Sequence, residues 1–93
     1  MRIAEVIGRV TLSRWHPSLD AARWRIVVPL SQAGLRSADS GRGEALVMYD
    51  ALGSSEGSRI ALSEGAEASA PFFPDQKPLD AYNAAILDSI DVP

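Results

Sequence analysis

The chain has 93 residues and a mass of 9.9 kDa, the size of one domain spanning 1–93. Its 46% hydrophobic and 23% charged residues exclude general disorder, and its short apolar runs exclude a membrane-spanning helix. With no cysteine and no signal-peptide core, we expect a cytoplasmic protein without disulfides or thiolate metal sites. Because so small a chain buries only about 60–65% of its unfolded surface, we expect oligomerisation to add stability.

The charge balance argues against nucleic-acid binding, with one local exception. Nine basic and twelve acidic side chains give a net charge of −3, whereas proteins that bind nucleic acid carry a basic excess. Arg14, Arg23 and Arg25 nevertheless cluster in the sequence with Trp15 and Trp24. This cluster fits a stacking surface for single strands, or arginine stems that cover apolar surface at a subunit contact. The whole-chain charge favours the second interpretation.

Two strands are predicted in the first third of the chain. Over residues 1–14, apolar and polar side chains fall on opposite faces, as in a long strand. Gly8, in its middle, predicts a bend, a bulge or a close backbone approach. Residues 16–18 have turn chemistry, and residues 23–30 alternate again as a second strand. Pro29 cannot donate to a ladder, so we expect that end at an edge or an exit.

The middle of the chain predicts a loop followed by two further strands. Residues 31–43 are rich in Ser, Gly and Ala, which predicts a mobile loop. Residues 44–49 and 58–63 have strand character, and a glycine-punctuated turn at 50–57 joins them.

The last third is less regular. Alanine and glutamate at 64–70 predict one helical turn, and three prolines at 71–78 predict an irregular segment. The tail has two interpretations: residues 85–90 fit a short final strand, whereas helical spacing joins Leu79, Tyr82, Ile86 and Ile90. Four or five short strands with glycine-rich turns predict an all-β chain, either a small closed barrel or a sandwich.

No catalytic motif stands out. His16 is the only histidine, which excludes a metal site of two imidazoles within one chain. A Gly-x-Ser-x-Gly elbow is absent, and the 50–57 turn lacks the lysine that grips phosphates in a phosphate-binding loop. We therefore expect no enzyme activity, no cofactor and no metal. A small enzyme with a site between subunits, including His16, stays as an alternative.

Several segments together resemble a known family. Residues 3–10, the Pro-Ser-Leu turn leading into 23–30, the 50–57 turn and residues 84–91 follow one another in the order and spacing of that family. The pattern is similar to that of the bacterial microcompartment vertex proteins of the EutN/CcmL family. Two departures are Ser55, where the family has a glycine, and 64–69, which lacks the arginine the family often carries there.

The resemblance implies a five-stranded, OB-like β-barrel with one short helical turn, and it favours the strand interpretation of the tail. It further implies a structural protein that forms homopentamers at the vertices of a shell, in contact with hexameric shell proteins. Neither nucleic acid nor a membrane is then a partner. The alternative function is an OB-like module for single-stranded nucleic acid that uses Trp15, Trp24 and the nearby arginines.

The resemblance also assigns candidate site residues. In the family, the turn matching 50–57 lies near the five-fold axis, which makes Gly53, Ser54, Ser55 and Glu56 the candidate pore rim. Small residues suit a turn that meets four copies of itself. Candidate subunit contacts are Arg9, Phe72 and Phe73, since two adjacent phenylalanines in a proline-rich segment need burial that a small monomer does not readily provide.

Overall fold

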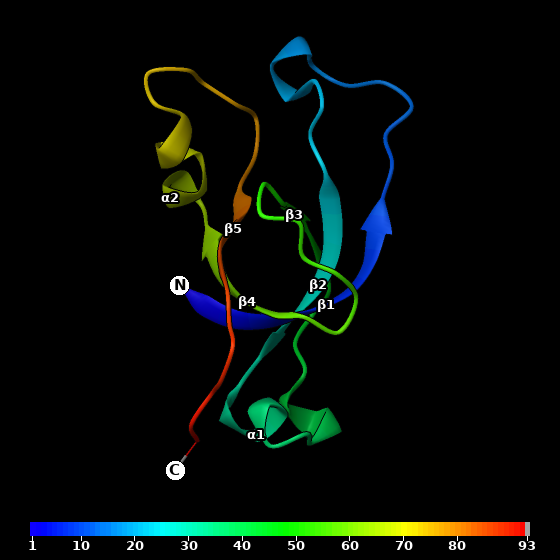
Figure 1. Cartoon of the computed structure of the whole chain (residues 1–93), viewed down its shortest axis with the longest axis vertical. Coiled ribbons are helices and arrows are strands. Elements are labelled where there is room, and N and C mark those ends of the chain that lie inside the picture. The colour runs from blue at the N-terminus through cyan, green and yellow to red at the C-terminus, as the bar shows by residue number, and fades with distance from the viewer. Residues whose placement is uncertain (93) are drawn as a thin grey trace.

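The computed structural model describes residues 1–92, which form a closed barrel (Figure 1). Around the barrel the strands follow the order β1-β2-β3-β5-β4. All neighbouring pairs are antiparallel except β3 and β5, which are parallel and share a single rung, Tyr49 opposite Tyr82. The strands are β1 (Arg2–Val10), β2 (Trp24–Leu30), β3 (Leu46–Tyr49), β4 (Arg59–Glu64) and β5 (Ala81–Ile86). The predicted five-stranded all-β barrel is therefore confirmed.

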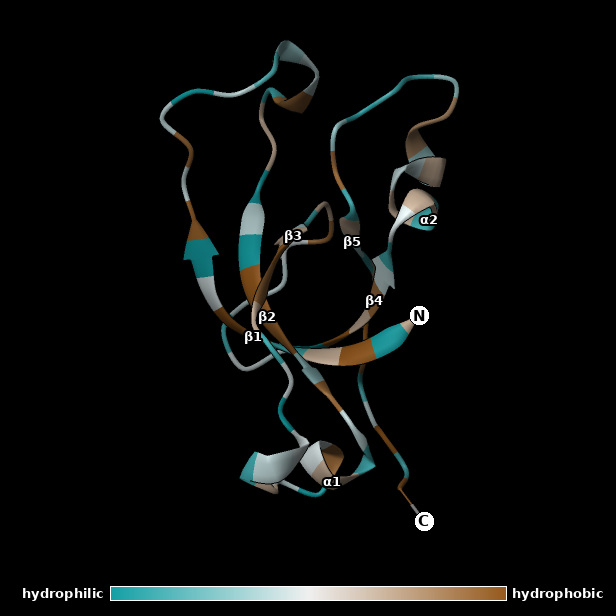
Figure 2. Cartoon of the chain, turned by 180° about the vertical axis from the view of Figure 1, so that it is seen from behind, coloured by the Kyte–Doolittle hydropathy of each residue, from teal (hydrophilic) through white to brown (hydrophobic). Residues whose placement is uncertain are grey.

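The interior of the barrel holds a small apolar core. Alternate residues of each strand point inward, as the period of two requires, and Figure 2 shows the brown apolar segments along the strands. The core cluster consists of Ala4, Val6, Val27, Met48, Ile60, Leu62 and Ala81. Because so few side chains fill the barrel, much of the chain's apolar content stays on its outer surface.

The first strand is shorter than the sequence predicts. The β1–β2 register shifts between Val6 and Gly8, so the predicted irregularity near Gly8 is confirmed. The ladder then ends at Val10, opposite Trp24, and not at residue 14. Within residues 1–92, no strand pairs with the chain beyond Val10, because β2 begins at Trp24 and β4 pairs with β1 only up to Glu5.

Residues 31–43 do not form the predicted loop without regular structure. They fold into α1 (Gln32–Leu35) and the 3₁₀ turn η2 (Asp39–Gly41), which lie at one end of the barrel (Figure 1). Gly34 and Gly41 make this possible, since a Cβ on Gly41 would lie 1.8 Å from the Gly34 nitrogen. An ion pair of 2.8 Å between Arg42 and Glu5 then attaches the segment to β1. Close packing of glycine backbones is a tertiary effect, which composition does not reveal.

The tail is a strand, and the helix suggested by its periodicity is wrong. β5 begins at Ala81 and ends at Ile86, earlier than the predicted 85–90. Its pairing with β4, from Ile60 opposite Ile86 to Glu64 opposite Ala81, closes the barrel. The inward positions belong to the small Ala81 and to a polar residue, Asn83, so the strand lacks an alternating pattern of large apolar side chains.

Two long connections project from the other end of the barrel (Figure 1). One, residues 11–23, contains the 3₁₀ turn η1 (Pro17–Leu19). The other follows β4 and contains α2 (Ala66–Ser69), the predicted helical turn, and the 3₁₀ turn η3 (Ala70–Phe72). Lys77 Nζ donates a hydrogen bond to the Ser18 carbonyl oxygen, which joins the two connections. No helix within residues 1–92 is long and apolar enough to cross a membrane.

Substitution of a core isoleucine tests this architecture. Ile60→Ala should lower the free energy of unfolding by about 2–5 kcal/mol, because Ile60 is fully buried and its loss leaves a cavity. Ile86→Ala, at a position that is 45% exposed, should change it by only about 0.5 kcal/mol. Urea unfolding at one protein concentration measures both, and equal losses would contradict the described core.

Candidate functional site

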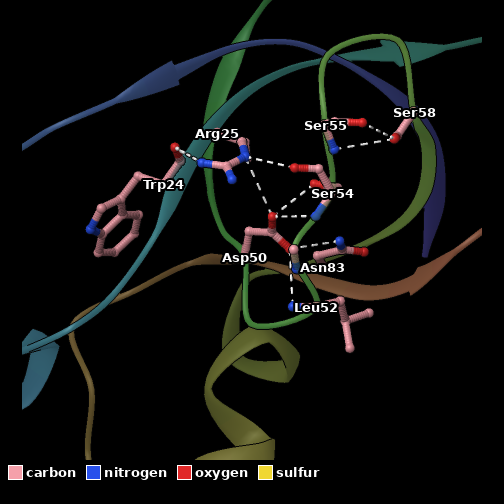
Figure 3. A network of polar contacts seen from close by, with 9 residues as sticks. Trp24, Arg25, Asp50, Leu52, Ser54, Ser55, Ser58 and Asn83 are labelled. Atoms are coloured by element: carbon pink, nitrogen blue, oxygen red, sulfur yellow. Dashed lines mark hydrogen bonds and ion pairs between the residues drawn. The ribbon is translucent and has the colours of Figure 1, made fainter.

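The turn that follows β3 is built around a buried carboxylate. Asp50 is only 1% exposed, and both of its oxygens accept hydrogen bonds from the turn itself (Figure 3). Oδ1 accepts from the backbone nitrogens of Leu52 and Gly53 at 3.1 and 3.2 Å. Oδ2 accepts from the backbone nitrogen and the hydroxyl of Ser54, both at 2.8 Å. A single side chain thus fixes the path of the next four residues.

Two other strands hold the same carboxylate. Asn83 of β5 donates from Nδ2 to Asp50 Oδ1 at 3.0 Å, within the barrel. Arg25 of β2 places Nε 3.5 Å from Asp50 Oδ2 and donates from the same nitrogen to the Ser54 carbonyl oxygen at 2.9 Å. Figure 3 shows Arg25 and Asn83 converging on Asp50. The turn is therefore fastened to β2, β3 and β5 together.

These contacts decide the charge state of Asp50. Burial by itself raises the pKa of the Asp50 carboxyl, because a low-dielectric surrounding disfavours the charged form. Hydrogen bonds from Asn83, Ser54 and Leu52 act in the opposite direction and outweigh burial. The pKa of Asp50 therefore lies below its ordinary value, and the carboxylate is charged near neutral pH.

The four candidate pore-rim residues occupy this turn but differ in exposure. Gly53 has a φ of +82°, a conformation that favours glycine, and its surface is open. Ser55 and Glu56 are exposed, and the Ser55 nitrogen donates to the hydroxyl of Ser58 at 3.2 Å. Ser54 is 2% exposed and points toward Asp50, so its side chain supports the turn from within.

The candidate subunit contacts also differ in how exposed they are in the monomer. Phe72 is partly buried in its own subunit, with ring centroids 5.2 Å from Tyr49 and 5.6 Å from Tyr82. Phe73 is 85% exposed. Arg9 is exposed and lies directly opposite Arg25 in the β1–β2 ladder. Of these three residues, Phe73 and Arg9 remain on the surface of the monomer.

The tryptophan and histidine residues have structural contacts. Trp24 packs edge-on against Tyr49, with centroids 5.5 Å apart, and Trp15 Nε1 donates to Asp20. His16 caps η1, where its Nδ1 accepts from the Ser18 nitrogen at 3.1 Å. Residues 1–92 contain no group of three acidic or histidine side chains placed to hold a metal ion.

Sequence reasoning found the turn but missed its anchor. Asp50 at the head of a Gly- and Ser-rich segment is a signal for a side chain that bonds its own turn. Nothing in the sequence marks Asn83 or Arg25 as its partners, since they lie 33 and 25 residues away along the chain.

The described residues combine a closed barrel with one densely hydrogen-bonded turn at its surface. The comparisons with known proteins identify the family in which this arrangement occurs. Residues 1–88 match the family model described as ethanolamine utilisation protein EutN/carboxysome. The chain belongs to this family, as its sequence resemblance suggests.

Several solved structures share the fold over nearly the whole chain. CcmL from Nostoc sp. PCC 7120 is 26% identical, with a TM-score of 0.82 over 99% of this chain and 92% of that one. The GrpN pentameric microcompartment shell protein from Rhodospirillum rubrum is 23% identical, with a TM-score of 0.81 over 98% of both chains. EutN from Escherichia coli is 22% identical, with a TM-score of 0.81 over 98% of this chain and 88% of that one. A search of curated proteins found no match.

The pH dependence of stability tests the carboxylate anchor. Asp50→Asn should lower the free energy of unfolding by about 3 kcal/mol at pH 7, because it leaves the Arg25 charge without its partner. The pKa of Asp50 is lower in the folded than in the unfolded chain, so its stabilisation is complete above about pH 4 and is lost at lower pH.

The difference between the wild-type chain and Asp50→Asn should therefore narrow as the pH falls below about 4. Denaturant unfolding at a series of pH values measures this difference. Asp88→Asn, at an exposed aspartate, is the matched control and should change stability little at any pH. A gap between the wild-type chain and Asp50→Asn that stays constant down to pH 2 would contradict the assignment.

Proposed function

We propose that this chain is a structural shell protein whose homopentamers cap the vertices of a bacterial microcompartment. The family match over residues 1–88 carries the proposal, together with the shared fold of the pentameric shell protein GrpN. Its role is architectural, without catalysis and without a cofactor. It resides in the microcompartment shell within the cytoplasm, where hexameric shell proteins are its neighbours.

The surface of the monomer supports assembly. Large apolar side chains remain exposed around a small core: Met1, Ile7, Leu12, Trp15, Val47, Leu52, Phe73 and Ile86. A head-to-tail contact repeated around an axis covers part of this surface on every subunit and leaves no free end once the ring closes. The ring thus supplies burial that a chain of this size lacks.

The turn at 50–57 suits a position near the five-fold axis. Gly53, Ser55 and Glu56 present small or polar groups to the outside, and the Asp50 network holds their backbone in one shape. Five such turns meet without a clash only if they are small and uniformly placed. In this proposal the rim consists of these three residues, and buried Ser54 braces them.

The single-stranded nucleic-acid alternative has weaker support. Trp24 packs against Tyr49, and Arg25 is engaged by Asp50 and the Ser54 carbonyl oxygen, so two of the groups that this alternative needs already have partners within the chain. The net charge of −3 opposes a phosphate backbone.

Native mass spectrometry of the purified protein tests the proposal first. The expected species is a pentamer of about 49.5 kDa, five times the 9.9 kDa of one chain. Co-expression with hexameric shell proteins should then give closed particles in electron micrographs, whereas the hexamers alone should not close. A stable monomer at working concentrations would contradict the proposal.

A matched pair of substitutions tests the rim. Gly53→Trp and Gly53→Ala introduce the same backbone strain at a φ of +82°, but only tryptophan adds bulk at the axis. We expect Gly53→Ala to assemble with a loss of about 1 kcal/mol in stability and Gly53→Trp to lose the pentamer in native mass spectra. Normal assembly of Gly53→Trp with an unchanged central opening would remove Gly53 from the rim.

A further inference from the structure

A hollow of about 460 Å³ lies between the end of β1, the connection 11–23 and the start of β2. Leu12, Trp15 and Leu19 give it an apolar floor, and Arg9 and Arg23 line it as well. We call it the tryptophan groove. Trp15 is 48% exposed here, and Trp15 and Leu12 are among the large apolar side chains that the monomer leaves uncovered.

The rim of the tryptophan groove has positive charge that its own subunit does not compensate. Arg9 and Arg25 face each other across the β1–β2 ladder, where like charges repel. Asp50 neutralises Arg25, but within residues 1–92 neither Arg9 nor Arg23 forms an ion pair. A matching occupant therefore combines an apolar group with a nearby carboxylate.

The connection between α2 and β5 presents this combination. Phe73 is 85% exposed, and Asp75, two residues later, is exposed as well. Within residues 1–92, Asp75 has no ion pair. Figure 1 shows that the connection from β4 to β5, which carries them, projects from the same end of the barrel as the connection 11–23, on the other flank. Phe73 does not line the groove of its own chain.

This connection is held in place before any partner binds. Phe72 packs edge-on against both Tyr49 and Tyr82, and Lys77 lies 5.0 Å from the centre of the Phe72 ring. Lys77 Nζ also donates a hydrogen bond to the Ser18 carbonyl oxygen, which holds the chain on the C-terminal side of Phe73. A side chain presented from a fixed backbone loses little conformational freedom on docking, and this favours binding.

We propose that Phe73 of one subunit occupies the tryptophan groove of the next, with Asp75 facing Arg9 and Arg23. The inference rests on the proposed pentamer and names the two surfaces that meet in it. Because donor and acceptor surfaces differ, the contact is heterologous and repeats from subunit to subunit until the ring closes. A buried aromatic side chain removes about 150–250 Å² from water and makes a typical central anchor of an interface.

Disulfide trapping tests the contact directly, since the chain has no cysteine of its own. A chain with both Leu12→Cys and Phe73→Cys should cross-link to two neighbours under mild oxidation. Non-reducing gels should then show a ladder that ends at five chains and collapses on reduction. The control pairs Phe73→Cys with Ile86→Cys, at an equally accessible site outside the groove, and should stay monomeric on the gel.

The outcomes separate this inference from the proposed function. A wild-type pentamer in native mass spectra without a ladder from the Leu12 and Phe73 pair would overturn the contact and leave the vertex role standing. A wild-type monomer would overturn both. Dimers alone would indicate a two-fold contact, and equal cross-linking of the Ile86 control would indicate random collision. Either result contradicts the inference.

A second measurement does not depend on disulfide geometry. Phe73→Ala should weaken assembly at least about tenfold, read as the protein concentration at which pentamers dissociate, while monomer folding is unchanged. Ile86→Ala is the matched control and should leave that concentration unchanged. An oligo-dT strand that quenches Trp15 and blocks the cross-link in a salt-dependent way would assign the groove to nucleic acid and overturn the inference.

Discussion

The charge of one buried aspartate organises the outer turn of this barrel. Removing a carboxylate from water is unfavourable unless hydrogen bonds replace the lost solvation, and Asp50 obtains them from its own turn, from β2 and from β5. The same contacts that keep the charge tolerable therefore dictate where residues 51–54 run. A turn fixed in this way presents the same surface on every copy, which a symmetric ring requires.

Apolar side chains are divided between the core of the barrel and its surface, where they are available for subunit contacts. A barrel this small encloses only a few of them, and the others lie on the wall and on the two long connections. In an isolated subunit these exposed groups are a liability for solubility, whereas in a closed ring they become contact surface. In the proposed contact, the arginines beside the tryptophan groove add selectivity, because a neighbour without a carboxylate would leave their charges uncompensated.

Much of the fold was predictable from the sequence, and the site only in part. Alternation located the strands, and Gly8 marked the irregularity in the first ladder, because both effects are local. Only the family resemblance favoured a strand in the tail. The inward positions of β5 carry the small Ala81 and the polar Asn83, so the alternation of apolar and polar side chains that marks a strand is missing. The 31–43 segment was misread because the contact between Gly34 and Gly41 exists only in three dimensions. The partners of Asp50 were beyond reach for the same reason.

The β3–β5 pair has a single rung, Tyr49 opposite Tyr82, which makes it the least extensively paired junction between neighbouring strands of the barrel. Aromatic side chains supply the contacts that the ladder lacks at this junction. The two tyrosines stack with centroids 6.0 Å apart, and Phe72 packs edge-on against both. Contacts across this junction thus come from aromatic packing more than from the ladder. Phe72 adjoins Phe73 in the chain. In the proposed pentamer, a neighbouring subunit that binds Phe73 therefore also holds Phe72 against the β3–β5 junction of each barrel.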